Sequence, residues 1–251
     1  MTTSPFLVNI EMRETNFPNL MEYPYNIPIF KDKDFKLQIK KPILIISGDN
    51  GTGKSTLLEI IASSCDFNIN GGNKNHLYSG QKNDVEKILN NLKFSWKFKV
   101  NDGFFMRSDS FLHFANYIDE QTQFVGNNAY AFYGGKSLNE QSHGESFLSL
   151  FENRFTKRGI YILDEPEAAL SPQKILVFIA IIKELADSGN VQFIISTHSP
   201  MLMAIPNSQF IYITDNHLEE KSYRETEHFL ITKSFLDNPE RFFKHLFDNE
   251  E

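Results

Sequence analysis

The hydrophobic pattern of this chain alternates between short buried runs and longer periodic segments. Consecutive apolar, largely β-branched residues at 43–46, 160–163 and 193–195 are typical of strands that are buried on both faces. Apolar residues recur every three to four positions at 57–62 and 175–185, which predicts helices. Strands that alternate with helices favour an α/β fold with a mostly parallel central sheet.

Other segments show a different period. Apolar and polar residues alternate at 6–13 and 93–100, which predicts strands with one exposed face. The stretch 27–39 predicts a hairpin, and together these segments predict an antiparallel β subdomain beside the main sheet. The pattern is less regular over 66–141, so we expect a small helical or irregular lobe there, inserted in a single domain that spans residues 1–251.

Composition narrows the class of protein. The chain has 251 residues, 41% of them hydrophobic, and its net charge of −7 argues against a uniformly basic nucleic-acid binder. The single cysteine, Cys65, excludes an intrachain disulfide and is typical of a buried small side chain. The N-terminus lacks a basic segment followed by an apolar one, and no apolar run approaches the ~18 residues of a membrane span. We therefore expect a cytoplasmic protein without a membrane span.

The strand at 43–46 leads into a glycine-rich loop and then into a helix. Gly48, Gly53, Lys54 and Ser55 fit the phosphate-binding pattern G-x-x-x-x-G-K-[ST] in its required strand–loop–helix setting. Glycines let backbone N–H groups turn toward a phosphate, Lys54 reaches the β- and γ-phosphates, and the Ser55 hydroxyl binds Mg²⁺. An ordinary glycine-rich turn would match the bare pattern by chance in roughly 1% of chains of this length. The pattern therefore predicts nucleotide binding at Gly48, Asp49, Asn50, Gly51, Thr52, Gly53, Lys54, Ser55 and Thr56.

Two further apolar strands end in polar chemistry. One ends at Asp164-Glu165 and the other at Thr197-His198. The carboxyl ends of parallel strands meet at one edge of a sheet, so we expect these groups to lie beside the phosphate loop. Asp164 would hold Mg²⁺ through water, Glu165 would polarise the attacking water, and His198 would hydrogen-bond the γ-phosphate. Each of these two strand ends is weak evidence for a nucleotide site by itself. Together with the phosphate loop, and in this order along the chain, they are strong evidence for one.

These motifs together resemble an ABC-type ATPase, that is, a P-loop NTPase. Residues 48–56 resemble Walker A, 160–165 resemble Walker B, and Ala169-Leu170-Ser171 resembles the D-loop. Ser142-His143-Gly144-Glu145 resembles the ABC signature, and His198 resembles the switch histidine. The resemblance implies hydrolysis of ATP to ADP and phosphate. It also implies a head-to-tail homodimer that forms with ATP, in which Ser142, Gly144, Glu145 and Ser171 of one subunit complete the site of the other.

The sequence departs from the transporter pattern at two places. His143-Gly144-Glu145 replaces the usual Gly-Gly-Gln of the signature. The glutamine of the Q-loop cannot be placed among Gln81, Gln121 and Gln123, and residues 107–109 can occupy its region. The residues of the Walker B and switch-histidine segments are more similar to those of RecF/OLD-like bacterial ATPases of the AAA family. The absence of a heptad pattern argues against a long-armed SMC-type protein.

Several alternatives stay open. The leading hypothesis is a stand-alone ATPase that drives a dimerisation switch for a DNA-processing or phage-defence partner. This choice of partner rests on family analogy alone. The others are a nucleotide-binding subunit of a membrane transporter, an ATP-gated scaffold with little turnover, and a small-molecule kinase. An aromatic side chain upstream of the loop can stack on adenine, and the candidates are Phe17, Tyr23, Tyr25 and Phe35. A local basic patch for a DNA partner has as candidate residues Lys31, Lys33, Lys36, Lys40 and Lys41.

Overall fold

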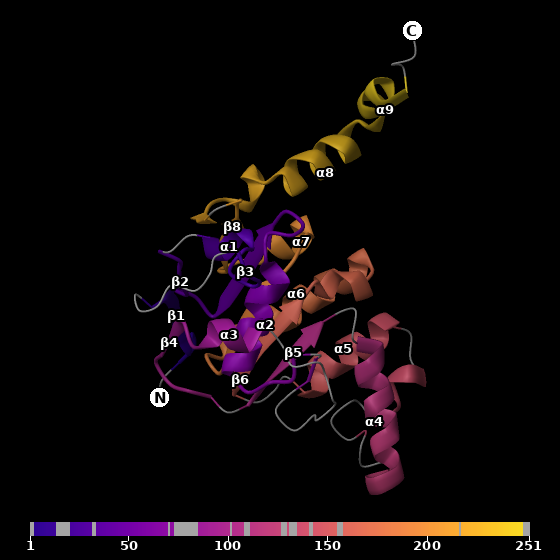
Figure 1. Ribbon diagram of the computed structural model, residues 1–251. Helices are drawn as coiled ribbons and strands as arrows, with labels where there is room; N and C mark the ends of the chain where they lie inside the picture. The colour runs from indigo at the N-terminus through magenta and orange to yellow at the C-terminus, as the bar shows by residue number, and fades with distance from the viewer. Residues whose placement is uncertain are drawn as a thin grey trace.

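A six-stranded sheet forms the centre of the molecule (Figure 1). The computed structural model describes residues 3–13, 21–31, 34–69, 71–72, 85–100, 102–107, 111–126, 130, 135–140, 143–154, 158–215 and 217–247. In spatial order the sheet contains β5 (Gly103–Arg107), β6 (Gly159–Asp164), β7 (Val191–Ser196), β3 (Ile43–Gly48), β8 (Gln209–Ile213) and β9 (Leu218–Glu220). Every neighbouring pair is parallel except β8 and β9, which run antiparallel. The predicted α/β fold with a mostly parallel sheet is confirmed.

Side chains of the sheet alternate between two hydrophobic layers. Ile43 and Ile45 of β3 face one layer, and Leu44 and Ile46 face the other. The first layer is covered by α4 (Phe111–Val125), α5 (His143–Arg154), α6 (Pro172–Asp187) and α7 (Pro200–Met203). The second is covered by α1 (Pro28–Lys31), α2 (Lys54–Ser64), α3 (Val85–Leu89) and the smaller sheet. Burial on both faces explains why these strands are continuous apolar runs.

A smaller antiparallel sheet packs beside the main one. Its strands are β2 (Lys36–Gln38), β1 (Leu7–Met12) and β4 (Leu92–Trp96), in that spatial order. The buried Gln192 of β7 ties the two sheets together. Its Oε1 accepts from the backbone N–H groups of Phe6 and Leu7 at 2.8 and 2.9 Å, and its Nε2 donates to the Leu7 carbonyl at 2.9 Å. The predicted antiparallel β subdomain is confirmed.

One detail of the predicted organisation needs correction. The stretch 27–39 is not a hairpin, because residues 28–31 form α1 and only 36–38 form a strand. Ile29 and Phe30 are adjacent and both buried, which a helical turn permits and a one-faced strand does not. The stretch 66–141 also contains strands. β4, which the alternation at 93–100 predicted, joins the small sheet, and β5 forms an edge of the main sheet.

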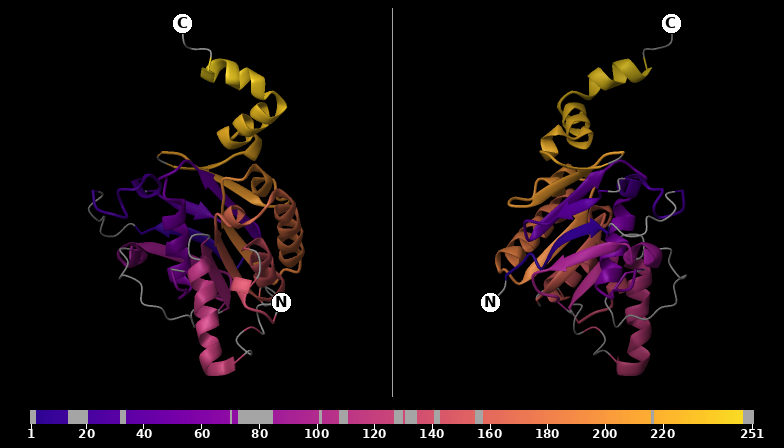
Figure 2. Two further views of the ribbon diagram at one scale, coloured as in Figure 1. Left: turned by 90° about the vertical axis from the view of Figure 1, so that its right-hand side faces the viewer. Right: turned by 60° about the vertical axis from the view of Figure 1, so that its left-hand side comes forward.

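The C-terminal helices project away from the rest of the molecule (Figures 1 and 2). After the short helix η4 (Tyr223–Glu225) come α8 (Glu227–Asp237) and α9 (Pro239–Phe247), which bury none of their residues. Within the described part of the chain, no helix combines the length and the apolar character needed to cross a membrane.

Cys65 lies directly after α2 and is buried. Burial raises the pKa of its thiol to about 12, so the side chain stays protonated at neutral pH. The thiolate is the nucleophilic form of cysteine, and Cys65 is therefore a core residue rather than a reactive one.

Candidate active site

The phosphate loop connects β3 to α2 and is tightly enclosed at both ends. Gly48 and Gly53 have φ angles of 152° and 103°, which side-chain-bearing residues rarely adopt. A Cβ at Gly48 would lie 2.6 Å from the Ile213 carbonyl oxygen of β8. A Cβ at Gly53 would lie 2.8 Å from the side chains of Ile27 and Ile29. The loop geometry therefore requires glycine at these two positions.

Lys54, the first residue of α2, lies in the centre of this loop. Its Nζ donates hydrogen bonds to the backbone carbonyls of Gly48 at 2.8 Å and Asp49 at 2.7 Å. Burial lowers the pKa of Lys54, and the carboxylates of Glu165 and Asp164 counter that shift. A cation is thus held where a phosphate on the loop would meet it, beside the N-terminus of an 11-residue helix.

Tyr212 of β8 fixes the start of the same loop. Its hydroxyl donates to Oδ1 of Asp49 at 3.1 Å. Burial and this carboxylate together raise the pKa of Tyr212 to about 12, so it stays a donor at all working pH values. Sequence reasoning did not identify Tyr212, because the two residues are 163 positions apart.

The two predicted magnesium ligands lie side by side. Ser55 of α2 forms a side-chain hydrogen bond with Asp164, which ends β6 and is 7% exposed. Burial raises the pKa of Asp164, and the Ser55 hydrogen bond and the Arg107 charge oppose that rise. Hydroxyl and carboxylate oxygens suit Mg²⁺. Mg²⁺ usually keeps several waters and binds through one or two protein oxygens together with substrate phosphates, and this pair of side chains suits that mode.

Arg107 is a charged neighbour of Asp164. From the sequence we placed it in the region of the Q-loop and assigned it no role. It ends β5 directly beside Asp164 and forms an ion pair with Glu59 of α2. Of the three glutamine candidates for the Q-loop, Gln121 lies within α4, while Gln81 and the side chain of Gln123 lie outside the described residues. The Arg107 guanidinium therefore stands at the strand end nearest to Asp164.

Glu165 follows Asp164 but has a different environment. Its backbone has φ 50° and ψ 52°, a left-handed conformation that costs about 1–3 kcal/mol in a residue with a side chain. Its N–H donates to the Ser196 carbonyl at 3.0 Å. Its side chain is 45% exposed, in contrast to the buried Asp164. The turn thus directs one carboxylate into the protein and the next toward the open site.

His198 follows β7 and faces Glu165. Its Nε2 lies 3.5 Å from Oε1 of Glu165. Burial and the Lys54 charge lower the pKa of His198, and Glu165 opposes them, so the neutral imidazole is favoured near pH 7. Because β6, β7 and β3 are neighbours, the structure brings Lys54, Asp164, Glu165 and His198 to one edge of the sheet.

Glu167 holds the segment that carries His198, and sequence reasoning missed it. Its Oε1 accepts hydrogen bonds from the Thr197 hydroxyl at 2.7 Å, the His198 N–H at 2.7 Å and the Ser199 N–H at 3.1 Å. Burial raises the pKa of Glu167, while the hydrogen bonds from Thr197 and His198 counter that rise. One carboxylate oxygen therefore sets the backbone at and around the histidine.

Replacing Glu167 with alanine is expected to destabilise the protein and disturb the site. The change leaves three partly buried donors without their acceptor, which at about 1.5–3 kcal/mol per charged hydrogen bond predicts a loss of at least 2 kcal/mol in the free energy of unfolding. Urea unfolding measures this loss. Glu167→Gln is the matched control, since it keeps an oxygen acceptor and should lose less than half as much. Equal stability of the alanine variant and the wild type would contradict the assignment.

Residues 143–145, which resemble part of the ABC signature, lie at the start of α5, beside residues 169–171, which resemble the D-loop. Gly144, in the first turn of α5, is buried, and a Cβ there would lie 2.9 Å from Cδ of Lys174 and 3.0 Å from the Ala169 carbonyl oxygen. Glu145 is exposed, and Ser142 lies outside the described residues. Ser171 caps α6, accepting from the Lys174 N–H at 3.4 Å. Contacts of these residues with the nucleotide of a second subunit stay predictions.

Tyr23 is the adenine-stacking candidate that the structure favours. Tyr25 and Phe35 are buried in the core, and Phe17 lies outside the described residues. Tyr23 is 42% exposed, and its hydroxyl lies 3.3 Å from Oγ1 of Thr56 in the first turn of α2. Its ring is therefore accessible beside the loop.

Replacing Tyr23 with alanine should weaken ATP binding about tenfold, because stacking of a base on an aromatic ring is worth about 1–3 kcal/mol. Titration with a fluorescent ATP analogue measures the dissociation constant. Tyr23→Phe keeps the ring and removes only the hydroxyl, so its affinity should stay within about twofold of the wild type. An unchanged affinity in Tyr23→Ala would exclude this side chain as the adenine platform.

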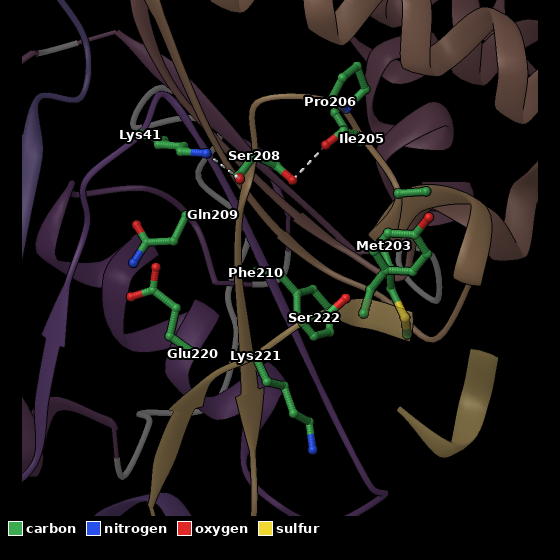
Figure 3. Close-up of a pocket in the computed structure, with 12 residues that line it drawn as sticks. Lys41, Met203, Ile205, Pro206, Ser208, Gln209, Phe210, Glu220, Lys221 and Ser222 are labelled. Carbon is green, nitrogen blue, oxygen red and sulfur yellow. Dashed lines mark hydrogen bonds between the residues drawn. The ribbon is translucent and has the colours of Figure 1, made fainter. Parts of the chain in front are cut away.

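A cavity of about 370 Å³ lies elsewhere, where α7 and the β8–β9 hairpin meet (Figure 3). Its lining includes Lys41, Phe210 and Tyr223, and none of the described lining residues belongs to the phosphate loop. The Lys41 Nζ points toward the strand and donates to the Ser208 carbonyl at 3.1 Å (Figure 3). This cavity is therefore separate from the candidate active site.

Comparisons with known proteins agree with the chemistry of this site. The family model of an AAA ATPase domain matches residues 137–203, which include Gly144, Asp164, Glu165 and His198. A curated relative, the tungstate uptake system ATP-binding protein TupC of Campylobacter jejuni, is 28% identical over 222 residues, or 80% of this chain. The match spans 62% of that relative's own length.

Two solved structures are also similar to this chain. The SMC head domain from Thermotoga maritima is 13% identical, covers 86% of this chain and 99% of its own, and has a TM-score of 0.47. A bacterial ABC transporter cassette solved as a dimer is 16% identical, covers 86% of this chain and 100% of its own, and has a TM-score of 0.41.

Proposed function

We propose that this chain, which has the fold and motifs of an AAA/ABC-type P-loop ATPase, binds Mg-ATP and hydrolyses it to ADP and phosphate. The observation that carries the proposal is the convergence of Lys54, Asp164, Glu165 and His198 at the carboxyl ends of three neighbouring strands. We further propose that residues 1–251 form one ATPase domain, since both hydrophobic layers pack on the same sheet. Its substrate implies a compartment that contains ATP, the cytoplasm.

Each residue has a defined task in this proposal. Backbone N–H groups of residues 48–56 and the Lys54 ammonium hold the β- and γ-phosphates. Ser55 and Asp164 hold Mg²⁺, which when bound neutralises charge on the phosphates. Glu165 orients the attacking water and accepts its proton, and the N–H of His198 donates to a γ-phosphate oxygen. The different environments of Asp164 and Glu165 support this division between metal binding and base.

We also propose that ATP drives dimerisation of two copies. The Glu165 side chain is 45% exposed. The second copy would supply Ser142, Gly144, Glu145 and Ser171 to the γ-phosphate. A helix N-terminus with small residues suits an anion, and this one has no phosphate of its own subunit to bind. The Lys40 Nζ lies 2.6 Å from Oε2 of Glu220, which partly neutralises the candidate basic patch. A DNA or protein partner of the dimer rests on family analogy alone.

The transporter subunit is the second candidate, and one observation favours it. The relative with 28% identity is, by its name, the ATP-binding protein of an uptake system. That function predicts copurification with a membrane-embedded subunit. The departures at His143-Gly144-Glu145 and at the Q-loop region weigh against it.

Two measurements on the purified protein test the proposal. Phosphate release in Mg-ATP should be abolished by chelation of Mg²⁺. The solution mass from light scattering should change from one copy to two with a non-hydrolysable ATP analogue. Absence of phosphate release would remove the enzymatic assignment. A mass that stays at one copy, together with copurification of a membrane protein, would favour the transporter subunit.

A further inference from the structure

A second histidine, contributed by the C-terminal helix α8, contacts the histidine of the candidate active site. Nε2 of His228 lies 2.9 Å from Nδ1 of His198, and the ring centroids are 4.9 Å apart. His198 thus has one ring nitrogen toward His228 and the other toward Glu165. No motif of the sequence pointed to His228, which is 30 positions away.

The base of α8 is fixed on the same segment that carries His198. Thr226, only 1% exposed, caps α8 by accepting from the Phe229 N–H at 3.3 Å, and its hydroxyl donates to the Tyr223 carbonyl at 2.6 Å. Its Oγ1 also lies 3.9 Å from the sulfur of Met203 in α7, the helix that begins two residues after His198. Thr226 therefore fixes the start of α8 against α7, and this sets the position of His228 relative to His198.

The contact between the two rings determines where the proton of His198 lies. A neutral imidazole carries one N–H, and only one of two hydrogen-bonded nitrogens can hold the shared proton. If Nε2 of His228 donates, then Nδ1 of His198 accepts and its N–H lies on Nε2, facing the Glu165 carboxylate. In the opposite arrangement two acceptors, Nε2 of His198 and Oε1 of Glu165, would face each other at 3.5 Å, which is repulsive.

The far side of His228 agrees with the first arrangement. Its Nδ1 is buried and has no hydrogen-bond partner among the described residues. That is acceptable for the unprotonated nitrogen of a neutral ring whose N–H is on Nε2. An unpaired buried N–H at Nδ1 would cost about 1–3 kcal/mol. Nε2 of His198 is likewise buried without a hydrogen bond among the described residues, and Oε1 of Glu165 lies 3.5 Å from it. The Glu165 carboxylate therefore decides between the two arrangements, and it favours the one in which His228 Nε2 donates to His198 Nδ1 and the His198 N–H lies on Nε2.

We infer that His228 is a positioning residue for ATP hydrolysis, which holds the His198 ring with its N–H on Nε2 and so couples the C-terminal helix α8 to the active site. This inference rests on the proposed function, because the task of the Nε2–H is to donate to the γ-phosphate. A group that acts on a reacting phosphate must keep one orientation and one tautomer. A displacement of α8 would remove the donor to Nδ1 and leave the ring free to turn or to change tautomer.

Two substitutions at His228 and one control separate positioning from general damage. His228→Phe keeps a ring but has no donor, so kcat for ATP should fall about tenfold, the effect of one lost hydrogen bond of about 1.4 kcal/mol. KM should change less than threefold, because the phosphate loop is untouched. His228→Gln can donate through its amide and should recover kcat to within about threefold of the wild type. The control is His245→Phe, which replaces a histidine of the neighbouring helix α9 in the same way. It should leave kcat unchanged.

A second readout does not depend on hydrolysis. Nitrogen-15 NMR of the histidine-labelled, nucleotide-free protein, assigned with His198→Gln, should show the His198 proton on Nε2 and Nδ1 as a hydrogen-bond acceptor. In His228→Phe, Nδ1 of His198 has lost its donor. Its resonance should then shift to the value of a nitrogen without a hydrogen bond, or to the average of a mixture of the two tautomers. A proton on Nδ1 of His198 in the wild type would overturn the inference, whether or not the protein hydrolyses ATP.

The kinetic outcomes are equally decisive. A kcat of His228→Phe within twofold of the wild type would overturn the inference while leaving the ATPase proposal intact. Equal losses in the phenylalanine and glutamine variants, with the His198 resonances unchanged, would also overturn it and indicate a structural role of α8. If the wild type itself releases no phosphate, the proposed function fails, and the NMR result alone decides whether His228 orients His198.

Discussion

Glu165→Gln is expected to reduce the turnover number for ATP at least a hundredfold, while ATP affinity stays within about threefold of the wild type. A positioned general base contributes about 10²–10⁴ to a rate, and glutamine has the same shape without the ability to accept a proton. Binding should survive because the phosphate loop and the Ser55–Asp164 pair are unchanged. Single-turnover phosphate release and equilibrium titration measure the two effects.

The same variant should accumulate the ATP-bound state. If hydrolysis normally separates the two copies, Mg-ATP should shift the solution mass of Glu165→Gln from one copy to two, as measured by light scattering. Glu184→Gln, an exposed position on α6, is the matched control and should behave as the wild type. Normal turnover in Glu165→Gln would remove the base assignment. A mass that saturating ATP leaves unchanged would count against the roles proposed for Ser142 and Gly144 in the partner site.

The parts of this site that could be predicted from the sequence are those encoded within one strand–turn segment. A buried apolar run followed by polar residues identifies a strand and the edge at which it ends, and this placed Lys54, Asp164 and His198 together. The α6 cap at Ser171 was predictable for the same reason, because Ser-Pro is a local helix-start signal. Local pattern is sufficient wherever the interaction partners are neighbours in sequence.

The parts that could not be predicted depend on contacts between distant segments. Tyr212 reaches Asp49 across two neighbouring strands, and Glu167 reaches the backbone around His198 from the preceding strand–turn segment. Neither contact has a spacing that a single sequence reveals. Helix α8 is different, since Ser222 and Glu225 form a capping box and Thr226 is a cap residue. That signal was present in the sequence, and it would have placed His228 on a helix although not beside His198.

Lys54→Ala is expected to weaken ATP binding about a hundredfold and to abolish measurable hydrolysis. The Lys54 ammonium is buried in the phosphate loop, and removal of one partner from a buried charge pair costs about 2–5 kcal/mol. An ammonium has three N–H groups, and the carbonyls of Gly48 and Asp49 accept from Lys54 Nζ at 2.8 and 2.7 Å, so a further N–H can donate to a phosphate oxygen when ATP binds. Isothermal titration measures the affinity, and phosphate release measures the turnover.

The expected stability of Lys54→Ala separates a binding role from a structural one. Burial already disfavours the charged amine, as the lowered pKa of Lys54 indicates, so the loss of two hydrogen bonds is offset by the removal of a buried charge. We therefore expect the free energy of unfolding without nucleotide to change by no more than about 1 kcal/mol. ATP should then raise the melting temperature of the wild type and of Lys87→Ala, an exposed lysine on α3, but not that of Lys54→Ala. Equal stabilisation of all three proteins by ATP would place the nucleotide away from this loop, and the assignments of Glu165 and His198 would fall with it.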